Sequence, residues 1–192
     1  MLEEEYNPRR KLPPHLKPAP PVDPEFAFEL RDATARDIPY MLEIYNHYVA
    51  NSTVTFDEEP LTLKEMRKRF ALVADLGYPW IVAVSPRGVL LGYAYVTPWK
   101  PKAAYRFTVE NSIYLGPAST GKGVGKALMA ELLTRSKAAG IKEIIAVIAD
   151  KGAEPSVAMH RNFGFVEIGH MGKVGFKFDR WLGTYLLQKS LK

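Results

Sequence analysis

The sequence contains no cysteine, which excludes disulfide bonds, thiolate metal sites and a cysteine nucleophile. Its four histidines include no pair spaced i,i+4, so we expect no metal site. No apolar run approaches the roughly 20 residues that a membrane-spanning helix needs. Residues 1–24 lack the apolar core of a secretory signal. Together these absences predict a soluble, cytoplasmic protein that has no membrane partner.

Charge of one sign is not strongly in excess either. The formal net charge is +5, from 26 Lys and Arg against 21 Asp and Glu, and the two signs are interspersed along the chain. Binding of nucleic acid would call for a clustered basic stripe, so we expect no nucleic-acid partner. A modest positive balance of this kind suits a small anionic molecule.

Proline is concentrated at one end of the chain. Residues 1–24 hold seven of the fifteen prolines and little apolar periodicity, which predicts an extension that forms neither helix nor sheet. The remaining residues, 25–192, are long enough for one full core and too short for two. We therefore predict one α/β domain behind an N-terminal extension.

Apolar periodicity predicts the order of elements within that domain. Predicted strands cover residues 26–34, 79–85, 89–99, 104–115, 142–150, 165–172 and 180–190. Predicted helices cover residues 34–49, with Thr34 as the N-cap, and residues 62–76, 122–139 and 155–162. This order predicts an antiparallel start followed by one β-loop-α-β unit.

That unit carries a glycine-rich loop, in the stretch YLGPASTGKGVGKALMAELL over residues 114–133. Glycines at positions 121, 123 and 125 let the backbone approach an anion closely. The helix that follows would direct its unpaired N–H groups and the positive end of its dipole at the same anion. Lys122 and Lys126 add positive charge. The loop therefore predicts a diphosphate site that needs no metal.

Two other interpretations of the loop remain open. A nucleoside-triphosphate loop fits from Gly116 to Lys122, but Gly123 stands where a hydroxyl would ligate magnesium and Pro117 removes a backbone donor. A purely structural glycine turn would need no ligand at all. The dinucleotide pattern G-x-G-x-x-G fails, because its last glycine is missing.

The loop resembles the acetyl-CoA loop of the GNAT acetyltransferase superfamily, Gln/Arg-x-x-Gly-x-Gly/Ala, with Thr120 in the first position. Five further segments are similar, in the same order, to the phosphinothricin N-acetyltransferase-like branch: NHYVANSTVTF (46–56), YPWIVAV (78–84), GYAYVTPWKPKAAYRFTVENSIYL (92–115), PSVAMHRNFGF (155–165) and GFKFDRW (175–181). Ala153 and Gly183 depart from that branch, which often has Asn and Asp there.

The resemblance covers about residues 28–190 and implies the GNAT fold, an α/β fold with a mixed, mostly antiparallel central sheet flanked by helices. It also implies acetyl-CoA as cosubstrate. The residues that it assigns to the coenzyme are Ile113, Tyr114, Leu115, Gly121, Lys122, Gly123, Val124, Gly125, Lys126 and Ser156. Ile113 to Leu115 would pair through their backbone with the pantetheine amides, because the strand there splays from its neighbour.

Acetyl transfer requires that the acceptor amine lose a proton, and we predict Glu110 as the general base. Strand alternation separates Glu110 from Val109 and Asn111, and a carboxylate inside a central strand is costly to bury without a task or partner. The alternative is an exposed glutamate, or one paired with Arg106 or Lys102. The resemblance makes His160 a second catalytic candidate, near Glu110, as a relay or as an acid for the leaving thiolate. A purely structural histidine is the alternative.

The resemblance also assigns Phe56, Lys102 and Tyr105 to the acceptor pocket, where a positive side chain would select amino-acid-like acceptors such as phosphinothricin or methionine sulfoximine. Trp181 and Phe178 are expected in the core or at a dimer seam, since members of this branch are usually homodimers. The sequence thus predicts an acetyl-CoA-dependent N-acetyltransferase. A non-catalytic CoA-binding module and a nucleoside-triphosphate enzyme are the alternatives.

Overall fold

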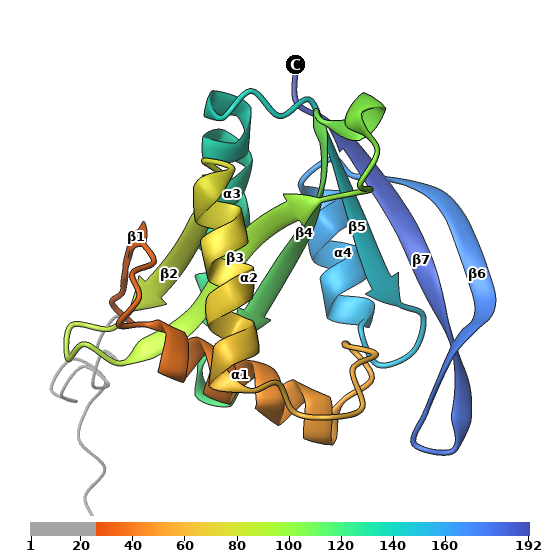
Figure 1. Cartoon of the computed structure of the whole chain (residues 1–192). Coiled ribbons are helices and arrows are strands. Elements are labelled where there is room, and N and C mark those ends of the chain that lie inside the picture. Colours follow the sequence, from red (N-terminus) through yellow and green to blue (C-terminus); the bar gives the residue numbers. More distant parts are fainter. Residues whose placement is uncertain (1–25) are drawn as a thin grey trace, which may run out of the picture.

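The computed structural model describes residues 26–192, and the predicted extension at residues 1–24 lies outside the described residues. The described chain forms one sheet of seven strands in the order β1-β2-β3-β4-β5-β7-β6 (Figure 1). The strands are β1 (Glu29–Asp32), β2 (Trp80–Val84), β3 (Leu90–Pro98), β4 (Thr108–Leu115), β5 (Glu143–Ala149), β6 (Val166–Lys177) and β7 (Arg180–Ser190). The α-helices are α1 (Ile38–Asn51), α2 (Leu63–Asp75), α3 (Val124–Ala138) and α4 (Glu154–Asn162).

All neighbouring strands are antiparallel except β4 and β5, which are parallel and joined through α3. The β4–β5 pairing is short: it joins residues 108–110 to residues 143–145 and ends with Glu110 opposite Ile145. Beyond that pair the two strands spread apart (Figure 1). We call this region, residues 111–115 of β4 and 146–149 of β5, the fork.

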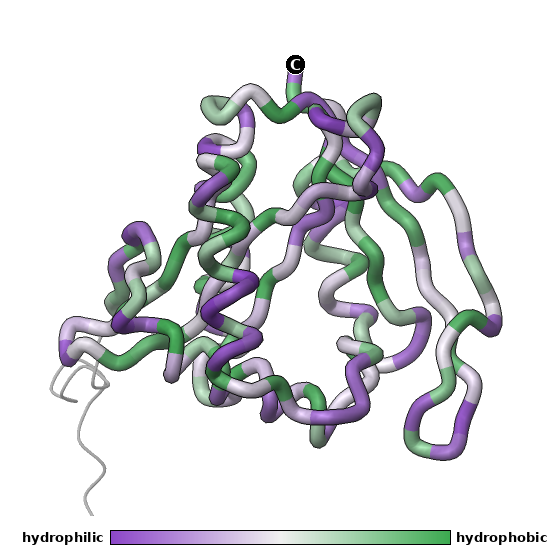
Figure 2. The backbone as a smooth tube through the Cα atoms, viewed as in Figure 1, coloured by the Kyte–Doolittle hydropathy of each residue, from purple (hydrophilic) through white to green (hydrophobic). Residues whose placement is uncertain are grey.

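Two hydrophobic clusters lie on opposite faces of the sheet. Tyr93 and Tyr95 of β3 pack with α1 and α2, whereas Ala94 and Val96 pack with α3 and α4. The alternation follows from the two-residue period of a strand buried on both faces. Figure 2 shows hydrophobic residues along the central strands and a polar stretch on α2, as expected for a helix with one solvent-facing side. The predicted mixed, mostly antiparallel sheet flanked by helices is confirmed.

The start of α1 was predicted wrongly. The helix begins at Ile38, with Asp37 at the N-cap position, and not at Thr34. Thr34 lies in a preceding turn, where its backbone N–H and hydroxyl both donate to the Asp37 carboxylate at 2.8 and 2.9 Å. The turn therefore takes up three residues before the helix begins.

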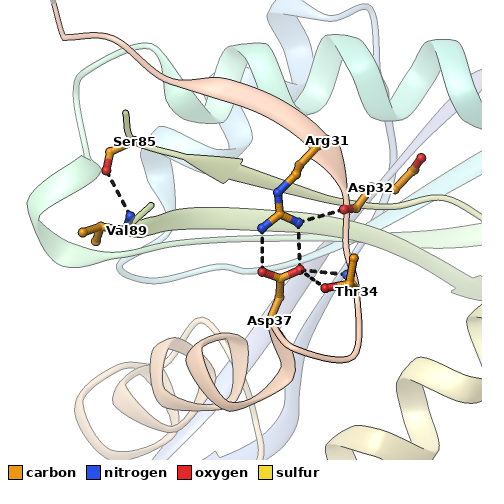
Figure 3. A network of polar contacts seen from close by, with 6 residues as sticks. All are labelled: Arg31, Asp32, Thr34, Asp37, Ser85 and Val89. Atoms are coloured by element: carbon orange, nitrogen blue, oxygen red, sulfur yellow. Dashed lines mark hydrogen bonds and ion pairs between the residues drawn. The ribbon is translucent and has the colours of Figure 1, made fainter. Parts of the chain in front are cut away.

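Asp37 also ties α1 to β1 through a bidentate ion pair with Arg31, at 2.8 and 2.7 Å (Figure 3). The hydrogen bond from Arg31 holds the pKa of Asp37 below its ordinary value, and the bonds from Thr34 act in the same direction. A lowered carboxyl pKa means that this pair stabilises the fold above the unfolded-state pKa and loses that effect as the pH falls through the folded one.

The predicted strand over residues 104–115 begins four residues late, at Thr108. Residues Ala103–Tyr105 instead form a 3₁₀ turn, closed by bonds from the N–H of Tyr105 to Lys102 and from that of Arg106 to Ala103. The last predicted hairpin is also longer than expected, because β6 continues to Lys177. It turns through Phe178 and Asp179, whose φ values are 52° and 55°. Two consecutive residues with positive φ match the twist of a tight hairpin.

The expectation that Phe178 and Trp181 are core aromatics is wrong. Phe178 is 50% exposed and Trp181 is 55% exposed. Both belong to the β6–β7 hairpin, where β6 is the edge strand and no helix shields the side chains of its tip. Large apolar side chains in such a position indicate a surface that another molecule covers.

Candidate active site

β4 directs neighbouring side chains to opposite faces of the sheet. Asn111 pairs with Val96 and shares its face, the one covered by α3 and α4. Glu110 pairs with Thr97, which lies two residues beyond Tyr95 on the α1–α2 face. The predicted separation of Glu110 from Asn111 therefore holds, and it decides which groups each one meets.

Glu110 is partly buried and makes no hydrogen bond or ion pair with any described residue, so the suggested pairing with Arg106 or Lys102 is not found. Burial raises the pKa of its carboxyl above the ordinary value, and the nearby charge of Lys100 opposes the shift only in part. A desolvated carboxylate without a partner is suited to accept a proton near neutral pH.

His160 is buried in α4, and its ring makes two hydrogen bonds. Nδ1 lies 2.8 Å from the Ser156 carbonyl, and Nε2 lies 2.9 Å from Nδ2 of Asn111. Because a carbonyl only accepts, Nδ1 carries the proton, and Nε2 accepts from the Asn111 amide. Burial lowers the pKa of this imidazole. Burial thus favours the neutral form of the ring.

Glu110 and His160 lie on opposite faces of β4, since His160 binds Asn111. No hydrogen bond joins their side chains, so the predicted relay would need a group between them. Asn111 was not predicted as a site residue, because the proposed chemistry gave tasks to the carboxylate and the imidazole and none to the amide between them. Lys100 was not predicted either, although it exerts more influence on Glu110 than the neighbouring Lys102.

The glycine loop connects the fork to α3. Gly121 and Gly123 have φ values of 74° and 82°, and a Cβ on either would meet nothing within 4 Å. Glycine is favoured at both positions because their φ values are positive, and not because a side chain would lack space. Gly125 is different: a Cβ there would lie 3.3 Å from Leu115 and 3.5 Å from Met159, so it allows α3 to pack close to β4 and α4.

The start of α3 is open to an anion. Gly123 occupies the N-cap position without a side-chain cap, and the first helical bond runs from Ala127 to Gly123. The N–H groups of residues 124–126 thus have no helical partner. Lys122 and Lys126 are exposed beside them. Along the fork, residues 113–115 pair with β3 on one side only, which leaves their β5-facing edge unpaired.

The three predicted acceptor residues lie on two separate segments, Phe56 on one and Lys102 with Tyr105 on the other. Phe56 packs against β6, where a Cβ on Gly175 would lie only 2.4 Å from its ring. Lys102 and Tyr105 are exposed on the 3₁₀ turn after β3. The segment that carries Phe56 is fixed by buried Lys177, whose Nζ donates to the carbonyls of Ser52 and Thr55 at 2.9 Å each.

Comparison with known proteins identifies the family and the fold. The profile of the acetyltransferase (GNAT) family matches residues 41–165. The chain belongs to this family. As a GNAT member it is an acetyl-CoA-dependent N-acetyltransferase, which excludes the nucleoside-triphosphate enzyme. That the glycine loop before α3 holds the coenzyme stays a prediction.

Individual relatives show which branch of the family the chain resembles. The chain is 43% identical over 155 residues to a phosphinothricin N-acetyltransferase of Alcaligenes faecalis, covering 81% of this chain and 78% of that protein. It is 39% identical over 162 residues to an L-methionine sulfoximine/L-methionine sulfone acetyltransferase of Pseudomonas paraeruginosa, covering 84% and 94%. The resemblance stated from the sequence segments is therefore confirmed.

A solved structure of a relative has the same fold. A GNAT phosphinothricin acetyltransferase of Sinorhizobium meliloti in complex with acetyl-CoA superposes with a TM-score of 0.81 at 46% identity, covering 85% of this chain and 88% of that one. Within residues 26–192, no group of three or more His, Cys, Asp or Glu is arranged to hold a metal ion. In the same part of the GNAT chain, no helix has the length and hydropathy to cross a membrane.

Proposed function

We propose that this GNAT enzyme acetylates the amino group of small amino-acid-like acceptors, with phosphinothricin and methionine sulfoximine or sulfone as model substrates. The acceptor class comes from the curated relatives, which are phosphinothricin and methionine sulfoximine acetyltransferases over most of the chain. The observation that carries the mechanism is Glu110, a partly buried carboxylate without a partner on β4, next to the last β4–β5 pair. We place the reaction in the cytoplasm, where acetyl-CoA is available.

In the proposed reaction, Glu110 takes a proton from the acceptor ammonium, directly or through water. The freed nitrogen lone pair attacks the thioester carbonyl, and backbone N–H groups of residues 113–115 stabilise the oxyanion that forms. The C–S bond then breaks, which gives the N-acetyl product and the CoA thiolate. Phe56, Lys102 and Tyr105 are proposed to hold the acceptor, with the Lys102 ammonium meeting its anionic group. In its neutral form His160 donates from Nδ1 to the Ser156 carbonyl and accepts at Nε2 from Asn111, so in that form it offers the thiolate no proton.

Thiol release from acetyl-CoA tests the acceptor class. We expect turnover with phosphinothricin, methionine sulfoximine and methionine sulfone, and less with ordinary amino acids, because an extra anionic or tetrahedral polar group gives the pocket more to bind. Wild-type protein that binds CoA by calorimetry yet acetylates none of this panel would instead support a non-catalytic CoA-binding module.

We also propose that the enzyme is a homodimer joined through the β6–β7 hairpin. Exposed apolar side chains gather there: Val166, Ile168, Met171, Val174, Phe176, Phe178 and Trp181. Phe176 and Trp181 face each other across the two strands, with ring centroids 5.5 Å apart. A patch of this kind along an edge strand indicates a protein partner, and a second copy of the chain presents the same self-complementary surface.

Light scattering after size-exclusion chromatography tests the dimer. We expect the wild type to elute at twice the chain mass of 21.6 kDa and the variant Phe176→Glu/Trp181→Glu to elute as a monomer. Tyr40→Glu is the matched control, because Tyr40 is exposed on α1, away from the hairpin. A wild-type monomer at micromolar concentration would contradict this part of the proposal.

A further inference from the structure

Asn111 is the first residue of β4 beyond its last pair with β5, so it lies at the closed end of the fork. Its side chain is buried, with 7% of the residue exposed, on the face covered by α4. The amide is held in place by its bond to Nε2 of His160. The Nδ2 group of the amide therefore has a hydrogen-bond partner, and this bond to a residue of α4 sets the orientation of the side chain.

The amide oxygen of Asn111 lacks such a partner. Oδ1 of Asn111 is buried and has no hydrogen-bond partner among residues 26–192. A buried acceptor without a donor destabilises the folded state, so a fold retains one only where something else compensates for it. In the neutral ring, whose Nδ1 donates to the Ser156 carbonyl, Nε2 is an acceptor, so turning the amide over would lose the bond that holds it and gain none for Oδ1.

The surroundings of the amide contain no protein donor for Oδ1. His160 is packed edge-on by Phe165, with ring centroids 4.9 Å apart. The sheet contributes apolar side chains to this core, among them Val109, Ile144 and Ala146. The donor must therefore come from outside the described residues. Two residues further along the same strand begins the edge of β4 at residues 113–115, which has no strand partner on its β5 side. The resemblance assigns this edge to the arm of the coenzyme.

We propose that Asn111 is a further coenzyme-binding residue, whose Oδ1 accepts a hydrogen bond from the pantetheine end of the coenzyme at the closed end of the fork. That end carries two kinds of donor. One is the cysteamine amide N–H, present in acetyl-CoA and in CoA, and the other is the thiol S–H, present only in CoA.

Calorimetric titration of acetyl-CoA and of CoA tests the assignment without any turnover. Asn111→Leu keeps the size of the side chain and removes the acceptor, so we expect binding to weaken about 3- to 10-fold, the value of one hydrogen bond. Asn111→Asp keeps an acceptor oxygen and should bind more tightly than Asn111→Leu. Ser136→Ala is the control, because it removes a buried hydroxyl that also lacks a partner, from the far end of α3.

Comparing the loss of affinity for acetyl-CoA with that for CoA identifies which coenzyme group donates to Oδ1. Weakening toward both ligands assigns the amide N–H, and weakening toward CoA alone assigns the thiol. Unchanged affinity of a folded Asn111→Leu variant for both ligands overturns the proposal. If that variant does not fold, a crystal structure of the wild type with CoA decides: a nitrogen or sulfur donor within hydrogen-bond distance of Oδ1 supports the assignment, and a greater separation refutes it. Because these measurements need no acceptor amine, they stand even if the proposed acceptor class fails.

Discussion

Glu110→Gln should lower kcat by about 100- to 10,000-fold while the affinity for acetyl-CoA stays unchanged. The amide has nearly the same shape as the carboxylate but accepts no proton near neutral pH. Stopped or continuous thiol assays give kcat, and calorimetry gives the affinity. Glu143→Gln is the matched control, because Glu143 is a carboxylate of the neighbouring strand that is bound to Ser190 and Gln188. We expect that control to retain its activity.

The pH dependence supplies a second check on Glu110. The base acts in its ionised form, and burial raises its pKa, so wild-type kcat/KM should rise with pH through a value above the ordinary glutamate range. Glu110→Gln should lose this acid limb. An unchanged limb in the variant would assign the ionisation to another group.

The same pKa shift predicts the effect on stability. A carboxyl whose pKa is raised by folding binds its proton more tightly in the folded state, so its ionisation at neutral pH works against folding. Glu110→Gln removes that penalty, and thermal unfolding at pH 7 should give a melting temperature equal to or above that of the wild type. A strong fall would attribute the lost activity to misfolding.

Gly183→Ala should be the most destabilising of the conservative substitutions considered. A Cβ on Gly183 would lie 2.3 Å from Oδ2 of Asp150 and 2.4 Å from the carbonyl oxygen of Met171. Neither atom is the free end of a flexible chain: the Asp150 carboxylate is held by the Gly183 N–H at 3.0 Å and by His170 at 3.0 Å. Overpacking at such a site costs about 1–3 kcal/mol, and more where backbone must move.

For a chain of this length, each kcal/mol corresponds to about 2–4 °C in melting temperature, so we expect Gly183→Ala to lose roughly 5–10 °C. Gly172→Ala is the control in the same hairpin, since its Cβ would meet only His170, at 4.0 Å. Adding Asp150→Gly should recover part of the loss by removing one of the two close contacts. A Gly183→Ala protein as stable as the wild type would show that β6 and β5 yield at no cost.

The same contacts explain why position 183 is occupied by glycine in this chain. The Asp150 carboxylate occupies the space beside residue 183 and binds both its N–H group and His170.

Much of the molecule follows from local sequence. The glycines at 121 and 123 indicate positive φ, and both have it, because no other residue adopts it at so little cost. The helix at α2 begins and ends close to the predicted positions, because Thr62 and Glu65 form a reciprocal capping box that depends on four consecutive residues. The two faces of β4 follow from a period of two. These features need no partner that is distant in sequence.

What the sequence did not reveal depends on contacts between distant residues. His160 lies behind β4 rather than beside Glu110 because α4 packs on the face that Asn111 shares, and Lys177 is buried because two carbonyls 122 and 125 residues earlier accept its N–H groups. Trp181 is exposed at the tip of the hairpin that β7 forms with the edge strand β6, and only the strand order places that hairpin at the edge of the sheet. The sequence by itself determined the family, the positions of the loop glycines and the alternation of side chains, all of which are patterns readable along the chain. The tertiary structure alone decided which side chains meet, because burial and hydrogen bonding are properties of the packed chain.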